Sequence, residues 1–115
     1  MRHVDGRFLG PVVICEDTSF HGMIDGDLRV DPGVRALVHG MIAGDLDIGR
    51  GADVELRGMV EGSSINRGRL RVYGVVRGFM RDEEGGETIL INRGAELRRS
   101  SERDRPRRRR AARRI

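Results

Sequence analysis

The chain has few aromatic residues, a single cysteine and no long apolar run. It contains no tryptophan, one tyrosine and three phenylalanines, so a buried core has to rest on Ile, Val, Leu and Met side chains. Cys15 alone excludes an internal disulfide, and we interpret it as a small apolar residue of the first strand rather than as a nucleophile. No segment approaches the roughly twenty apolar residues of a membrane span. Residues 8–15 are also too short for a secretory signal, so we expect a cytoplasmic protein.

What the chain does contain is an internal repeat. Residues 21–28 (HGMIDGDL) return eighteen positions later as residues 39–46 (HGMIAGDL), and in weaker form as residues 57–62 (RGMVEG). Glycines keep the same spacing in each copy: Gly22, Gly40 and Gly58 in one series, and Gly26, Gly44 and Gly62 in another. A fixed period is the signature of repeat architectures. The repeat therefore predicts one structural unit that is copied along the chain.

Apolar residues of this repeat fall on alternate positions, with Asp, Arg, Glu and His between them. Those on even numbers are Ile24, Leu28, Val30, Val34, Ala36, Val38, Ile42, Leu46, Ile48, Ala52, Val54, Leu56 and Val60. A period of two predicts strands with one buried face, and here the even face is inside. Residues 31–33 and 49–51 contain the Gly and Pro of tight corners.

Short strands joined by tight corners at an even period stack most simply as a solenoid. We therefore predict an all-β, single-domain parallel β-helix in which equivalent residues of successive coils form ladders about 4.8 Å apart. A hairpin-built sandwich is the structural alternative, because short strands with glycine turns fit it too. The regular eighteen-residue repetition favours the β-helix.

The pattern divides the chain into three parts. We expect residues 1–11 to be a leader that lies over the first coil, residues 12–97 to form about five coils, and residues 98–115 to be a disordered tail rich in arginine. After Gly62, two single deletions are expected to shift the register before Ile65, Leu70, Val72, Val76 and Gly78 resume the buried pattern. Residues 81–87 are predicted to be a polar loop that projects from a corner.

Charge is unevenly distributed. Residues 98–115 carry ten arginines against two acids, a net +8, whereas residues 1–97 carry twelve arginines against sixteen acids, a net −4; the sum is the overall +4. On the body we expect Arg29 to pair with Asp47, and Arg35 with Asp53, across adjacent coils. Attachment to a polyanion or membrane is assigned to six arginines of the tail: Arg107, Arg108, Arg109, Arg110, Arg113 and Arg114.

Three partners suit this basic tail: nucleic acid, an anionic membrane surface, or the acidic body of a neighbouring subunit. No aromatic residue lies among its arginines, which removes the stacking that single-strand binders use. A solvated tail that aids solubility is the alternative interpretation.

The sequence offers little for catalysis. His21 and His39 are expected to stack on adjacent coils, but both lie at outward positions and Arg57 takes the third place, so solvated side chains explain them better than a metal site. The nonapeptide that binds calcium in β-rolls is absent. Left-handed hexapeptide acyltransferases also have eighteen-residue coils, but here the cleft would be small and no long loop carries a histidine. We expect no enzyme activity, no catalytic or metal site and no cofactor.

Self-assembly is suggested by the backbone of a β-helix, which leaves an open edge at each end. Neither end has an obvious capping helix, and we expect copies to stack end to end through apolar residues of the terminal coils: Val12, Val13, Ile14, Ile89, Ile91 and Leu97. If residues 1–8 or the tail covered an end, the protein would instead remain a monomer or dimer. It would then be a small protein-binding module, immunity or antitoxin-like.

The repeat unit resembles that of the bactofilins, a family of bacterial cytoskeletal proteins. The matching segments are residues 22–30, 40–48, 58–62 and 74–78, and the resemblance covers roughly residues 12–97. It implies a right-handed, three-sided β-helix that polymerises end to end through its terminal coils without nucleotide. The chain departs from the family in its smaller number of coils, its more regular unit and its lack of a short apolar N-terminal membrane motif. The resemblance implies a filament- or scaffold-forming protein, and the basic tail suggests that it serves as an attachment segment, in the cytoplasm or at the inner membrane face.

Overall fold

The computed structural model describes residues 1–91 and 113–114, and the regular elements of these residues are all strands. The strands are β1 (Arg2–Leu9), β2 (Val12–Ile14), β3 (Thr18–Asp25), β4 (Leu28–Val30), β5 (Arg35–Ile42), β6 (Leu46–Ile48), β7 (Asp53–Leu56), β8 (Met59–Val60), β9 (Ser64–Asn66), β10 (Arg69–Val72), β11 (Val75–Val76), β12 (Met80–Asp82), β13 (Glu87–Leu90) and β14 (Arg113–Arg114). The prediction of an all-β fold is confirmed.

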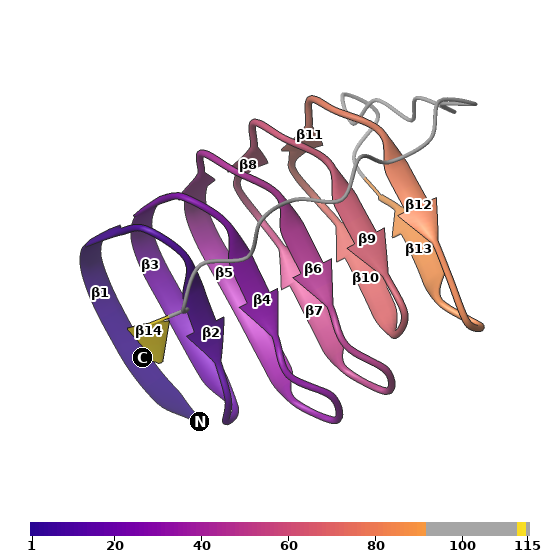
Figure 1. The fold of residues 1–115 in the computed structure, drawn as a ribbon, viewed down its shortest axis with the longest axis horizontal. Helices are drawn as coiled ribbons and strands as arrows, with labels where there is room; N and C mark the ends of the chain where they lie inside the picture. Colours follow the sequence, from indigo (N-terminus) through magenta and orange to yellow (C-terminus); the bar gives the residue numbers. More distant parts are fainter. Residues whose placement is uncertain (92–112, 115) are drawn as a thin grey trace.

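Two parallel sheets make up the molecule (Figure 1). Sheet A has the order β1-β3-β5-β7-β10-β13, with β8 and β11 continuing beside β5, and sheet B has the order β14-β2-β4-β6-β9-β12. The chain passes from sheet A to sheet B in every coil, so that β1 and β2 form coil 1, and β10, β11 and β12 form coil 5. Strand β13 begins a sixth coil. The predicted β-solenoid of about five coils is confirmed.

The core consists of inward side chains stacked in columns along the solenoid axis. Ile24, Ile42 and Val60 are fully buried and lie side by side in β3, β5 and β8, as the ladder prediction requires. Full burial of one such side chain contributes about 1.5–3 kcal/mol. Because each coil buries only one short row of side chains, most of the stability comes from contacts between coils.

Glycines form a second kind of ladder where sheet A bends. Its members occupy equivalent positions in coils 1 to 5: Gly6, Gly22, Gly40, Gly58 and Gly74. A Cβ on Gly40 would overlap the carbonyl oxygen of Gly22, and a Cβ on Gly58 would overlap that of Gly40. The repeated glycine is therefore required because the backbones of adjacent coils approach too closely for any side chain.

The first residues, expected to form a leader, are part of the solenoid. Strand β1 pairs in parallel with β3 over its whole length. Val4 and Phe8 pack against the core, and the ring centroid of Phe8 lies 5.8 Å from that of Phe20. The alternation of apolar and polar residues is weak in β1 because Arg2 occupies a position that is buried in the later coils. Coil 1 therefore begins at β1.

Corner length explains the change of register after Gly62. Four residues separate β6 from β7, but only two separate β9 from β10, so both deletions fall at one corner. Strand β9 consequently stays in register with β6: Ser64 and Asn66 are buried, and Ile65 lies between them at an outward position beside Asp47. The expectation that Ile65 resumes the buried pattern is wrong. Leu70, Val72 and Val76 are buried as predicted, and Gly78 lies against Gly62 of the preceding coil.

The polar segment at residues 81–87 consists of the end of β12, a four-residue corner and the first residue of β13. Strand β12 extends to Asp82, and β13 begins at Glu87. Residues 83–86 form a four-residue corner, the same length as the corner between β6 and β7. Arg81 and Glu87 occupy outward positions of strands, and Asp82 ends the inward column of sheet B at an exposed position. A hydropathy pattern does not distinguish such charged strand residues from a loop.

Candidate assembly interface

At the N-terminal end, β1 is the outer strand of sheet A. Met1 and Leu9 are 60% and 64% exposed, while Val4 and Phe8 are half-buried against the core. Among the residues that the structure describes, this end therefore presents an unpaired strand edge with apolar side chains on it.

The residues predicted to form the N-terminal assembly surface lie elsewhere. Val12 and Ile14 are fully buried and Val13 is 7% exposed, because β2 lies inside sheet B between β4 and β14. The side chains of Val12 and Ile14 belong to the core of coil 1, whereas Val13 lies at an outward position beside Arg29. The exposed residues Met1 and Leu9 were missed, because residues 1–11 were expected to lie outside the solenoid.

At the C-terminal end, β13 is the outer strand of sheet A and β12 is the outer strand of sheet B. The predicted residues Ile89 and Ile91 lie at this end and are 39% and 47% exposed. Leu90, 36% exposed, continues the inward column of Leu56 and Val72 and was missed by the prediction, although its even spacing from Val72 was a usable signal. Leu97 lies outside the described residues.

The apolar surface is thus divided between the two ends. In residues 1–91 and 113–114, the large hydrophobic side chains that are exposed belong to Met1, Leu9, Ile89, Leu90 and Ile91. Each of them lies in or next to an outermost strand of sheet A, β1 or β13. An open strand edge combined with apolar side chains is a surface that can pair with another strand.

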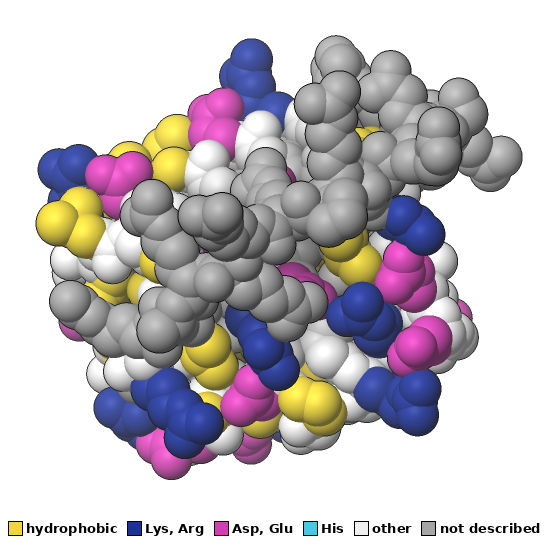
Figure 2. Space-filling model, in the orientation of Figure 1, with side chains coloured by type: hydrophobic (Ala, Val, Ile, Leu, Met, Phe, Trp, Pro, Cys, Tyr) yellow, Lys and Arg dark blue, Asp and Glu magenta, His cyan; other side chains and the backbone are white. Residues whose placement is uncertain are grey.

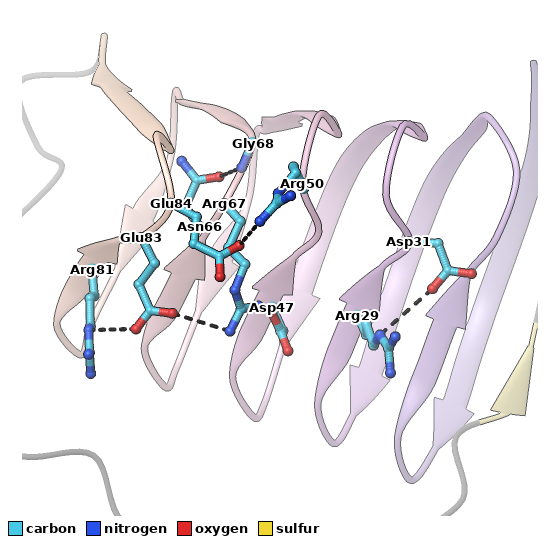
Figure 3. Close-up of polar contacts among 10 residues, drawn as sticks. All are labelled: Arg29, Asp31, Asp47, Arg50, Asn66, Arg67, Gly68, Arg81, Glu83 and Glu84. Atoms are coloured by element: carbon cyan, nitrogen blue, oxygen red, sulfur yellow. Dashed lines mark hydrogen bonds and ion pairs between the residues drawn. The ribbon is translucent and has the colours of Figure 1, made fainter.

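The sides of the solenoid carry ion pairs that link successive coils. Arg67 contacts Asp47 at 3.1 Å and Glu83 at 3.2 Å, and Glu83 contacts Arg81 at 2.8 Å, which links coils 3, 4 and 5 (Figure 3). Figure 2 shows acidic and basic side chains interspersed on the face in view. Exposed pairs of this kind contribute about 0–1 kcal/mol each.

The individual pairs differ from those expected from the sequence. Arg29 does lie beside Asp47 in the register, but its guanidinium pairs with Asp31 at 3.7 Å. Asp53 lies beside Arg35 and pairs with Arg71 of the other neighbouring coil at 3.3 Å. Long arginine side chains reach several acids, so the strand register alone does not determine the partner.

The aspartates of the Gly-Asp-Leu repeat have a structural role. Asp27 Oδ1 accepts a hydrogen bond from the backbone N–H of Asp45 at 2.8 Å, and Asp45 Oδ1 accepts one from the N–H of Ser63 at 2.9 Å. Each carboxylate therefore satisfies a corner N–H of the following coil. The described residues contain no group of three or more His, Cys, Asp or Glu side chains that could hold a metal ion.

The two histidines stack as expected, with ring centroids 5.1 Å apart and both side chains exposed. Arg57 follows in the same column, and its guanidinium lies 4.3 Å from the ring centroid of Tyr73. Cys15 is exposed in the corner after β2, so its interpretation as an apolar strand residue is wrong: Ile14, immediately before it, is the last residue of that strand.

Only two of the six arginines assigned to attachment lie in the described part of the chain. Arg113 and Arg114 form β14, which pairs in parallel with β2 through Val12 and Val13. Arg107, Arg108, Arg109 and Arg110 lie outside it. Nothing in the sequence predicted β14, because a strand of two arginines shows no alternation. A helix that could span a membrane is not present in residues 1–91 or 113–114.

Comparison with known proteins adds no identification. No family model matches the chain, and neither a curated protein nor a solved structure matches it. The candidate function therefore rests on the geometry of the two ends.

Proposed function

We propose that this protein is a non-enzymatic structural protein that assembles end to end into filaments or scaffolds. The observation that carries the proposal is the location of the exposed large hydrophobic residues, which in the described part of the chain lie at the two ends and not on the sides. The resemblance of the repeat to bactofilins points to the same function.

The energetics favour stacking over lateral association. Covering Ile89, Leu90 and Ile91, which are 36–47% exposed, contributes about 1 kcal/mol each. Each backbone hydrogen bond that a second copy adds to an open edge contributes about 0.5–1.5 kcal/mol. The sides carry many charged groups already paired within the chain, and their apolar side chains, such as Met23, Met41 and Met59, are partly buried, so lateral contact would gain less apolar burial and would replace existing ion pairs.

The proposal is tested with two matched substitutions in one column of sheet A. Ile89 is at the end of this column and Leu37 is in the middle of it. Ile89→Glu places a carboxylate beside Arg71, and Leu37→Lys places an ammonium beside Glu55, so each new charge faces an opposite charge. We expect Ile89→Glu to weaken association about tenfold to a hundredfold, and Leu37→Lys to leave it unchanged.

Sedimentation velocity over a concentration series, with negative-stain electron microscopy, measures this difference. Filaments or long oligomers from the unmodified chain and from Leu37→Lys are the expected result. Discrete small particles at every concentration and salt level would overturn the proposal.

A second candidate function is favoured by one observation. Strand β14 pairs with the edge of β2, and a strand in this place can act as a cap that blocks the N-terminal end of sheet B. A protein closed in this way would be a monomeric or dimeric protein-binding module, and a sharp small species in the sedimentation experiment would support it.

We further propose that the arginine-rich segment attaches the assembly to a polyanionic surface at the inner face of the membrane or on nucleic acid. Replacing Arg107, Arg108, Arg109 and Arg110 with Ser leaves β14 in place and removes four positive charges. We expect weaker binding to anionic vesicles or to duplex DNA at low salt, and little binding of either chain at high salt. Equal binding by both chains would contradict this assignment.

A further inference from the structure

The two sheets are offset from each other by one strand. Sheet A and sheet B each contain six strands along their main path, but sheet A runs from β1 to β13 and sheet B from β14 to β12. At the N-terminal end, β14 extends sheet B one strand beyond coil 1. At the C-terminal end, β13 extends sheet A one strand beyond coil 5. Figure 1 shows β14, in yellow, beside β2 at the N-terminal end and β13 at the other end.

These two steps are complementary. Every strand pairing is parallel, including those of β14 with β2 and of β12 with β9. A second copy placed in the same orientation beyond the C-terminal end would set its β1 beside β13 and its β14 beside β12. Both sheets would then continue without a missing strand. A symmetric junction of two identical ends would instead pair their edge strands antiparallel, unlike every strand pairing within the described part of the chain.

Continuing the register brings matching side chains together. Along the inward columns, Arg2 follows Thr88 and Val4 follows Leu90, so the half-buried Val4 of the next copy would cover the exposed Leu90. The two sheet A edges therefore offer an apolar contact at the centre of the junction.

Charge favours the same orientation. Asp82 lies at an exposed position in the column of Ile14, Val30, Ile48 and Asn66, which is the inward column of sheet B. Glu87 begins the adjacent strand β13. Arg2 of the next copy would follow Thr88, whose hydroxyl donates a hydrogen bond to Asp82, so Arg2 would lie close to this acid. In sheet B the same register sets Arg114 of the next copy beside Arg81, so the favourable charge contact is the one in sheet A. Two C-terminal ends placed face to face would bring the acids together.

We propose that copies join head to tail, and that β13 of one copy and β14 of the next complete a single coil at the junction. This inference rests on the proposed end-to-end assembly and specifies its polarity, its register and the role of β14. Strand β14 is then the half-coil that fills the junction rather than a cap that prevents it.

Disulfide trapping tests the polarity and register. In a Cys15→Ser background, His3→Cys and Ile89→Cys place one thiol on each outer strand of sheet A, in one outward column. Within one chain these strands are separated by four others, a distance of about 24 Å. Across the proposed junction their Cα atoms are about 4.8 Å apart, within the range for a disulfide. We expect oxidation to give a ladder of covalent oligomers in non-reducing gels.

Three controls make the result decisive. His3→Cys with Glu87→Cys, two positions out of register, should link poorly. Covalent dimers from His3→Cys alone or from Ile89→Cys alone would indicate symmetric junctions and overturn the proposal. Filaments without the His3–Ile89 link would overturn it and leave the proposed function standing, whereas an absence of any oligomer would overturn both.

A chain that ends at Ala112 tests the role of β14. It lacks residues 113–115, which include both residues of β14, and we expect its association to be about tenfold weaker, as the loss of one or two backbone hydrogen bonds predicts. Circular dichroism should show an unchanged β-sheet spectrum. Association that is unchanged would show that β14 does not contribute to the junction, and tighter association would identify β14 as a cap; either result overturns the proposal.

Discussion

Arg50 Nη2 lies 2.7 Å from Glu84 Oε2, although the two residues belong to corners of coils 3 and 5. The contact skips a coil because the corner between β9 and β10 has only two residues and does not reach as far out as its neighbours. The same two-residue deletion that shifts the sequence pattern after Gly62 thus allows two longer corners to meet over it (Figure 3).

This contact predicts a pH-sensitive carboxylate. The hydrogen bond from Arg50 lowers the pKa of Glu84, with the charge of Arg50 as the next cause. Because the pKa of Glu84 is lowered in the folded state, the contact stabilises the fold at pH values above the pKa that Glu84 has in the unfolded chain. This contribution to the free energy of unfolding is lost as the pH falls through the pKa of the folded state. We expect Arg50→Ala to raise the pKa of Glu84 in an NMR titration.

Arg69→Ala is the matched control for this titration. Arg69 pairs with Glu87 at 3.7 Å and is not among the groups that lower the pKa of Glu84. The Glu84 pKa should stay low in this variant. An Arg50→Ala chain with the same Glu84 pKa as the unmodified chain would contradict the assigned cause.

The charged network on the side of the solenoid should contribute little stability. Arg67 bridges Asp47 and Glu83, but all three side chains are 25–31% exposed. We expect Arg67→Ala to lower the free energy of unfolding by about 1 kcal/mol or less, and the difference to shrink in high salt. Urea unfolding at two salt concentrations measures it. A loss of several kcal/mol that does not depend on salt would mean that Arg67 acts through packing instead.

The strands between residues 21 and 60 could be predicted because every second residue is apolar and the copies are nearly identical. Strand β1 could not be predicted, because Arg2 stands at a position that is buried in later coils and weakens the alternation of apolar and polar residues. Ile65 was assigned to the core because a hydropathy pattern does not reveal at which corner residues are deleted. Ser64 and Asn66 occupy the inward positions there, and polar residues give no such signal.

The candidate interface was predictable only in part. Ile89 and Ile91 are apolar residues near the end of the repeat and do lie at an exposed end. Val12 and Ile14 are equally apolar but are enclosed, because β14 adds a strand outside them. The pairing of β14 with β2 brings together segments about a hundred residues apart, which no local pattern encodes.

The glycine ladder predicts a large difference between two Gly→Ala substitutions. A Cβ on Gly40 would overlap the backbone of Gly22, and the φ of Gly40 is 155°, whereas a Cβ on Gly33 meets nothing within 4 Å. We expect Gly33→Ala to lower the free energy of unfolding by about 1–2 kcal/mol, because the φ of Gly33, 74°, lies in the left-handed region. Gly40→Ala should cost at least about 3 kcal/mol or prevent folding, since backbone cannot move aside as a side chain can. Equal midpoints in urea unfolding would contradict the ladder.

Strand β9 buries two polar residues, Ser64 and Asn66, and replacing each with alanine should change the free energy of unfolding in opposite directions. Ser64 Oγ is buried and has no hydrogen-bond partner in the described part of the chain, so Ser64→Ala removes an unsatisfied hydroxyl and should stabilise the fold by about 1 kcal/mol. Asn66 Nδ2 donates to the carbonyl oxygen of Glu87 at 2.7 Å, and its Oδ1 accepts from the N–H of Gly68 at 3.0 Å. Asn66→Ala leaves both backbone groups without this partner and should cost about 2–4 kcal/mol. Thermal and urea unfolding of both variants test this contrast, and a destabilised Ser64→Ala chain would mean that the hydroxyl is satisfied by water.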